Sequence, residues 1–215
     1  MTMINMLEIE FEFGGQQQTI WPVMIQTESD VILVDCGYPH FLERLEEAAL
    51  RQGVRFESVT KLILTHDDID HIGSAAALKK KYPHVEILAF ETEADYIGGT
   101  KKSLRLIQAE QTLEGLAGEA KANAERFVQY LKTVEPVQAD RTLHDEELLS
   151  GEIVVIHTPG HTPGHISLYI PSRKTLIAGD ALVAEDDKLK IANPQYCLNL
   201  EDALRSVRKL RQFDI

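Results

Sequence analysis

The sequence has little cysteine and no long apolar stretch. Its cysteines, Cys36 and Cys197, lie far apart and form no Cys-x-x-Cys pair, which argues against both a disulfide framework and a thiolate zinc cluster. No apolar run approaches the roughly 20 residues of a membrane-spanning helix, and residues 1–13 lack the basic and apolar regions of a signal peptide. We therefore expect a cytoplasmic protein without a membrane span.

Basic side chains are scarce relative to acidic ones. The chain has 22 Lys and Arg residues against 34 Asp and Glu residues, so its formal net charge is -12. Proteins hold nucleic acids and anionic membranes mainly with lysine and arginine, and we expect neither as a partner. With 44% hydrophobic and 26% charged residues, the composition is that of an ordinary globular protein. We expect a small-molecule substrate, and the composition leaves a homodimer open.

Hydrophobic periodicity predicts an α/β fold. Residues 7–13 alternate apolar with acidic side chains, a pattern typical of a strand with one buried face. Together with strands expected at residues 19–26 and 31–34, this segment predicts an antiparallel meander. Strands and helices then alternate, with a helix over residues 41–52, a strand over 61–65, a helix over 72–82 and a strand over 85–90.

Residues 92–132 form a different kind of segment. They are rich in Ala, Glu, Lys and Leu, and glycines interrupt them near residues 98–99 and 115–118. We interpret them as a helical insertion between two sheet halves of a single domain, residues 1–215. Beyond this insertion, strands are expected at residues 153–156, 166–170 and 175–178, and a final helix at 200–213. This order predicts a sheet-rich core that is covered by helices on its outside.

Histidines and aspartates gather where the expected strands end. The strand over residues 61–65 runs into Thr-His-Asp-Asp-Ile-Asp-His at 65–71, ahead of the next helix. A second segment, Thr-Pro-Gly-His-Thr-Pro-Gly-His at 158–165, follows another apolar strand, and Gly179-Asp180 ends a third. Imidazoles and carboxylates at neighbouring strand ends can converge on a cation. Each Asp alone also suits a solvated helix cap, but the whole set favours a metal site at a sheet edge.

This pattern resembles the metallo-beta-lactamase superfamily, whose motif His-x-His-x-Asp-His is followed by a distant His and a distant Asp. The resemblance covers nearly the whole chain, including the turn Val34-Asp35-Cys36-Gly37, where the family's Asp has a structural role. It implies a four-layered αβ/βα sandwich (the metallo-beta-lactamase fold) with two divalent metal ions where the halves meet. Zinc is the metal that we expect. The implied ligands are His66, Asp68 and His161 for the first metal, Asp70 and His71 for the second, and Asp180 between them.

Two positions depart from the family pattern. Asp68 stands where the second histidine is expected, which predicts a harder, more anionic pocket that also tolerates iron or manganese. The flavodiiron branch of the superfamily carries a carboxylate there too. In addition, the family's last histidine follows the final helix, whereas no histidine follows His165 in this sequence. We expect the missing ligand to lie on a strand beyond Ile215.

The resemblance implies a metallo-hydrolase with a binuclear centre, similar to the glyoxalase II and lactonase-like branches. A metal-bridging hydroxide would attack a small ester, thioester or lactone, with Asp70 as the catalytic residue that binds metal and accepts or orients the hydroxide proton. The carboxylate of Asp68 favours an alternative, an iron-dependent redox enzyme of the same fold. A binding module with a weakened metal site is a third hypothesis.

Other polar residues near these motifs are interpreted as structural. His165 is expected to orient its loop. Tyr196 and Asn193 follow Asp180 within reach of a substrate, although aromatic loop residues more often serve packing. Surface or structural roles are expected for the remaining histidines, which are His40, His84, His144 and His157.

Overall fold

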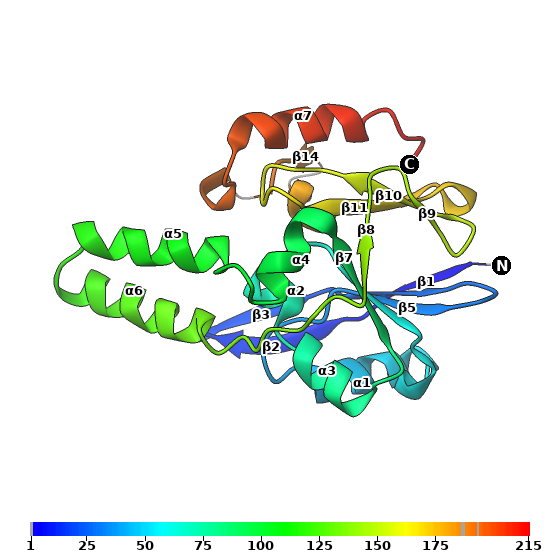
Figure 1. The fold of residues 1–215 in the computed structure, drawn as a ribbon, viewed down its shortest axis with the longest axis horizontal. Helices are drawn as coiled ribbons and strands as arrows, with labels where there is room; N and C mark the ends of the chain where they lie inside the picture. Colours follow the sequence, from blue (N-terminus) through cyan, green and yellow to red (C-terminus); the bar gives the residue numbers. More distant parts are fainter. Residues whose placement is uncertain (1, 186–187, 193) are drawn as a thin grey trace.

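The computed structural model describes residues 2–185, 188–192 and 194–215 and contains two main sheets that face each other (Figure 1). The larger sheet consists, in spatial order, of β1 (Met3–Met6), β4 (Val23–Gln26), β5 (Val31–Val34), β6 (Lys61–Leu64), β7 (Glu86–Phe90) and β8 (Arg141–Leu143). The smaller sheet consists of β12 (Thr175–Ile177), β11 (Ile166–Ile170), β10 (Ile153–His157) and β9 (Leu148–Leu149). Two separate hairpins pair β2 (Ile9–Phe13) with β3 (Gln16–Ile20) and β13 (Val183–Glu185) with β14 (Lys188–Lys190).

Helices cover the outer face of each sheet. α1 (Leu42–Arg51) and α3 (Ala75–Lys81) lie on the larger sheet, and α7 (Leu200–Leu210) lies on the smaller one (Figure 1). Neighbouring strand residues point to opposite faces, so in β5 Leu33 joins the core under α1 and α3, whereas Ile32 joins the core between the sheets. A third core lies between α7 and the smaller sheet. These four layers confirm the expected αβ/βα sandwich.

The strand directions bring the candidate ligands to one edge of the sandwich. β5, β6, β7 and β8 run parallel, so their carboxyl ends lie at the same end of the larger sheet. Asp35 follows β5, and His66 follows β6. In the smaller sheet, His161 lies between β10 and β11, and Asp180 follows β12. Segments far apart in the sequence therefore end beside one another.

The expected opening meander is right in its antiparallel pairings, β2 with β3 and β4 with β5, but wrong in its continuity as one sheet. β1 pairs antiparallel with β4, while β2 and β3 pair only with each other among the described residues. The strand expected over residues 19–26 is split at Trp21 and Pro22, where proline has no amide hydrogen for a ladder bond. The chain thus leaves the sheet after β1, forms a hairpin and returns as β4.

The helix expected over residues 72–82 is also interrupted. It begins earlier, as α2 (Ile69–Ile72), and continues as α3 after Gly73 and Ser74. A side-chain carbon at Gly73 would lie 2.3 Å from the backbone nitrogen of Pro39, and the Ser74 hydroxyl donates a 2.7 Å hydrogen bond to the carbonyl of Tyr38. The loop before α1 therefore packs into this break.

The segment expected to be helical contains α4 (Glu91–Ile97), α5 (Leu104–Thr112) and α6 (Gly118–Leu131). Figure 1 shows α5 and α6 side by side, projecting from the edge of the sandwich. Across the described residues, no helix has both the length and the apolar character needed to cross a bilayer. Single 3₁₀ turns complete the fold at Phe56–Ser58, Leu113–Gly115, Pro171–Arg173, Gly179–Ala181 and Pro194–Tyr196.

Gly160 provides a stability test of how the His161 loop docks on α7. Its φ is +138°, and a side-chain carbon at this position would lie 2.2 Å from the Ala203 nitrogen, which leaves no room for alanine. We expect Gly160→Ala to lower the free energy of unfolding by about 2 kcal/mol, because the loop or helix must shift. Denaturant titration measures this change. Gly115→Ala, which meets open space, is the control, and equal unfolding midpoints for the two variants would contradict the docking argument.

Candidate metal centre

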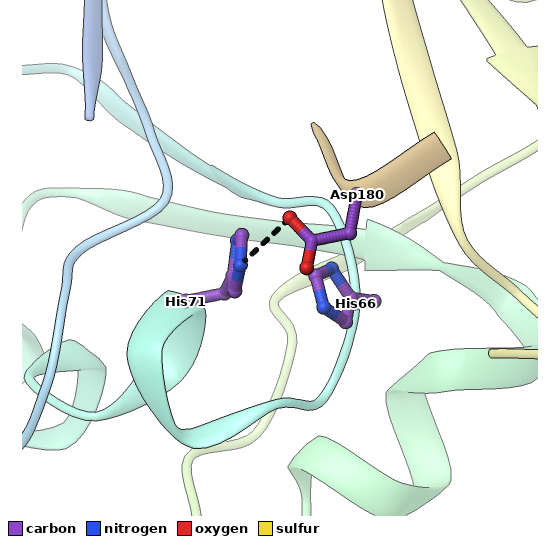
Figure 2. A group of neighbouring side chains, drawn as sticks. All are labelled: His66, His71 and Asp180. Carbon is purple, nitrogen blue, oxygen red and sulfur yellow. Dashed lines mark ion pairs between the residues drawn. The ribbon is translucent and has the colours of Figure 1, made fainter. Parts of the chain in front are cut away.

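Three segments converge at the edge where the two sheets meet. The loop between β6 and α2 supplies His66 and Asp68, α2 itself supplies Asp70 and His71, and the turn after β12 supplies Asp180. Figure 2 shows His66, His71 and Asp180 pointing toward one another from these segments. The β10–β11 loop adds the His161 side chain, which is only 4% exposed. The sequence-predicted ligand residues are therefore neighbours in space.

Asp35 fixes the orientation of the first two imidazoles. Its carboxylate accepts hydrogen bonds of 2.8 Å from both the amide and the hydroxyl of Thr65, and lies 2.8 Å from Nδ1 of His71. Because the Thr65 hydroxyl donates to Asp35, it accepts from Nδ1 of His66, which is 3.0 Å away. Both histidines thus donate from Nδ1 and turn Nε2 toward the centre. This arrangement is typical of metal-ligating histidines and their carboxylate partners.

The side chains form two groups that share His66. In the first, Oδ2 of Asp68 lies 3.6 Å from Nε2 of His66 and 2.8 Å from Nε2 of His161. In the second, His66 joins His71 and Asp180, and an Asp180 oxygen lies 3.3 Å from Nε2 of His71. Within each group, one ligand atom per residue lies within 4.8 Å of the others. Either group has the donor atoms of a divalent metal site.

Asp180 lies between the two groups, and Asp70 lies at their margin. The two carboxylate oxygens of Asp180 face different imidazoles, one 3.3 Å from His71 and the other 3.5 Å from His161. Burial alone would raise the pKa of Asp180, but the charge of His71 and its hydrogen bond hold it well below its usual range. Asp70 is 3.7 Å from Nε2 of His71 and half-buried, and it belongs to neither three-residue group.

His66 provides the test of whether a cation fits. Its ring is fully buried, and with Nδ1 bonded to Thr65 its Nε2 has no hydrogen-bond partner among the described residues. A buried nitrogen without a partner is costly, and a metal ion would satisfy its lone pair. The residues present therefore fit a metal ion.

His165 orients Asp180, in agreement with its expected role. Nε2 of His165 accepts a 2.9 Å hydrogen bond from the Asp180 amide, so its proton is on Nδ1, which lies 2.8 Å from the Thr158 hydroxyl. Burial and the neighbouring His66 and His161 push the pKa of His165 well below its usual value. A neutral, fully buried imidazole thereby holds the turn after β12 in place.

Sequence reasoning missed Arg105, which α5 places in the first group. Nε of Arg105 lies 3.0 Å from Oδ1 of Asp68, and Nη2 lies 2.7 Å from Oδ2. Hydrogen bonds from His161 and Arg105, together with the nearby charge of His66, hold the pKa of Asp68 well below its usual range despite its burial. The expected more anionic pocket is therefore wrong at this position, because a guanidinium neutralises the carboxylate. The only local signal was a charged residue between Leu104 and Leu106.

Sequence reasoning also missed Glu93 of α4, which ties two ligand loops together. Its fully buried carboxylate accepts a 3.1 Å hydrogen bond from the Asp67 amide and a 2.7 Å hydrogen bond from the Gly164 amide. Burial, together with the charge of Glu93, raises the pKa of Asp67 to about 7. The first residues of the helical segment thus support the backbone of both histidine motifs.

The remaining candidates lie outside the two ligand groups. Asn193 is not among the described residues. Tyr196 is half-exposed, and its ring centroid lies 5.4 Å from the guanidinium carbon of Arg105. His157 stacks on Phe90 with ring centroids 4.4 Å apart. The other histidines, His40, His84 and His144, belong to neither group of possible metal ligands.

A family model for the metallo-beta-lactamase superfamily matches residues 18–215. The chain belongs to this superfamily. It is 28% identical to the uncharacterized protein YobT of Bacillus subtilis, over 91% of this chain and 84% of that protein. It is 25% identical to the probable metallo-hydrolase YybB of B. subtilis, over 85% and 70%. It is also 28% identical to the hydroxyacylglutathione hydrolase GloC of Haemophilus influenzae, over 72% and 62%.

Solved structures share the fold at lower sequence identity. A metallo-beta-lactamase family protein from Thermus thermophilus superposes with a TM-score of 0.70 at 23% identity, over 96% of this chain and 69% of that one. The FEZ-1 metallo-beta-lactamase of Legionella gormanii gives 0.64 at 17% identity, over 98% and 73%. These likenesses support the four-layered architecture described above.

Metal binding should release protons near neutral pH. Burial lowers the pKa of His71, but Asp35, Asp180 and Asp70 outweigh it and raise the pKa well above its usual value. The metal-free His71 is then protonated at neutral pH, whereas a ligand imidazole must be neutral. We expect apparent zinc affinity to rise with pH through this range.

Calorimetry of zinc binding in two buffers that differ in ionisation enthalpy measures the released protons. The surface variant His84→Gln is the control and should release as many protons as the wild type. Equal heats in both buffers would contradict the protonation of His71 in the metal-free protein.

Proposed function

We propose that this protein is a zinc-dependent hydrolase that cleaves a small ester, thioester or lactone. One observation carries the proposal: Nε2 of His66, which has no hydrogen-bond partner among the described residues, belongs to both ligand groups, and Asp180 directs one oxygen to each. This arrangement suits a pair of divalent ions. When bound, such a pair lowers the pKa of a coordinated water and polarises the oxygen of a carbonyl group.

Different side chains would bind the metal ions and transfer the proton. His66, Asp68 and His161 would hold one ion, and His71 and Asp180, with Asp70 beside them, would hold the other. Burial and the nearby Asp68 and Asp180 charges raise the pKa of Asp70 against the opposing effect of His71.

A carboxylate with a raised pKa is a better proton acceptor than an ordinary one. Asp70 is half-buried at the margin of the centre, and its position there lets it take a proton from water and return it to the leaving alcohol or thiol.

The relatives support hydrolysis over the alternatives. YybB is named a probable metallo-hydrolase, and GloC is named for a thioester substrate, hydroxyacylglutathione. The iron-dependent redox hypothesis rested on the charge of Asp68, which Arg105 neutralises. A small-molecule substrate in the cytoplasm, rather than a nucleic acid, also agrees with the acidic chain. The hypothesis of a weakened binding module predicts that the purified protein retains no metal.

Removing the metal should abolish hydrolysis. We expect protein purified without chelator to contain zinc by elemental analysis and to hydrolyse at least one member of a panel of esters, thioesters and lactones. Treatment with a chelator followed by desalting should eliminate this activity, and added zinc should restore it. A metal-loaded protein that cleaves no compound in the panel would refute the proposed substrate class, and a protein without metal would favour the binding module.

Replacing the proton acceptor Asp70 should slow the reaction without removing the bound metal. We expect Asp70→Asn to lower kcat about 10²- to 10⁴-fold, because an amide cannot accept the proton. Steady-state kinetics and elemental analysis are measured on the same preparation. Glu114→Gln, an exposed change in the helical insertion, should leave kcat unchanged. Unchanged kcat in Asp70→Asn would remove Asp70 from the mechanism.

A further inference from the structure

The helical insertion places one positively charged side chain, Arg105, in the candidate metal centre. Arg105 lies in the first turn of α5 and is only 5% exposed. Nε lies 3.0 Å from Oδ1 of Asp68 and Nη2 lies 2.7 Å from Oδ2, so the guanidinium binds both oxygens of this carboxylate. Such a two-point pair fixes the plane of the carboxylate as well as its charge.

Asp68 keeps one oxygen directed at the imidazoles while Arg105 holds it. Oδ2 lies 2.8 Å from Nε2 of His161 and 3.6 Å from Nε2 of His66. The oxygen held by Nε, Oδ1, has no imidazole partner in the described centre. The carboxylate is thus orientated so that one oxygen can serve as a ligand atom.

Arg105 is itself held from two further sides. Its Nη1 donates a 2.7 Å hydrogen bond to Oε1 of Gln108, one turn further along α5. Its guanidinium carbon lies 5.4 Å from the centroid of the Tyr196 ring, within the range of a cation–π contact. The guanidinium therefore has defined contacts on several sides.

The Asp68–Arg105 pair changes the net charge of the ligand set. Three imidazoles would give a neutral ligand set, whereas two imidazoles and a free carboxylate would carry one negative charge. The guanidinium of Arg105 cancels that charge, so His66, His161 and the Asp68–Arg105 pair together are neutral. A neutral set with nitrogen donors suits zinc, whereas a free carboxylate favours harder ions such as manganese.

We propose that Arg105 is a positioning residue that sets metal selectivity, because it aims Asp68 at the imidazoles and makes the Asp68–Arg105 pair equivalent to one neutral histidine. The inference rests on the metal-binding part of the proposed function and not on the substrate. One contact points to a competing role: Nη2 also lies 3.2 Å from Nε2 of His161, as it would if the guanidinium took the place of the first ion. The two roles predict opposite results.

The test compares zinc and manganese affinities in three variants of the full chain. Arg105→Met leaves the charge of Asp68 without its neutralising partner. The double variant Asp68→His with Arg105→Met replaces the pair by a single imidazole. Arg126→Met, an exposed change in the same insertion, is the control. Competition with a chromophoric chelator gives each affinity and the number of ions bound, and the visible spectrum of bound cobalt reports the ligand set.

We expect Arg105→Met to reduce the preference for zinc over manganese at least tenfold, a change in the range found for residues that support metal ligands. The double variant should regain the wild-type preference and a cobalt spectrum of greater nitrogen coordination. A merely structural role for Arg105 would change the unfolding temperature but not the preference. The control should match the wild type in every measurement.

Two results would overturn the proposal. An unchanged zinc preference in Arg105→Met would show that the guanidinium does not set selectivity. One additional bound ion in Arg105→Met would show that the guanidinium fills the first site instead. If the single variant does not fold, because it leaves a buried carboxylate without its partner, the double variant decides: loss of the wild-type preference there also overturns the proposal.

The outcome is separable from that of the proposed function. Metal affinities are measured without any substrate, so a protein that hydrolyses nothing in the panel can still confirm the selectivity role of Arg105. Conversely, active zinc enzyme with an unchanged preference in Arg105→Met would support the hydrolase and overturn only this inference.

Discussion

The candidate metal centre depends on the hydrogen bonds of the Asp35 carboxylate. This carboxylate accepts hydrogen bonds from the Thr65 amide and hydroxyl and lies 2.8 Å from Nδ1 of His71, so it determines which nitrogen of each neighbouring imidazole faces the centre. Asp35 can do this because β5 and β6 are adjacent and parallel, and its own amide donates to the carbonyl of Ile63. The pairing of β5 with β6 thus also fixes the orientation of the imidazoles in the centre.

Similar polar contacts hold the other ligand segments before any ion arrives. Glu93 joins the backbones of the two histidine motifs through Asp67 and Gly164, and His165 accepts from the amide of Asp180. These groups are buried, and leaving them unpaired would be costly. The centre is therefore preorganised by residues that do not themselves belong to the ligand groups, as precise metal sites require.

The helical segment contributes side chains that contact the ligand loops. α4 contributes Glu93, and α5 contributes Arg105, so two of its helices bear directly on the ligand loops. The exchange of a histidine for Asp68 is accompanied by a guanidinium from a distant part of the chain. In this member of the superfamily, the candidate ligand set and the helical segment have to be considered together.

The sequence by itself determined several buried strands and which candidate ligand residues gather at the sheet edge. Apolar runs predicted β5 and β6, and polar residues at strand ends predicted the candidate centre, because both signals are local in the chain. Only the tertiary structure decided the pairing of β1 with β4, the clamp by Glu93 and the neutralisation of Asp68 by Arg105. Arg105 and Asp68 are 37 residues apart, and Glu93 and Asp67 are 26 apart. Such contacts depend on how helices pack against the sheets, which local hydrophobic periodicity does not encode.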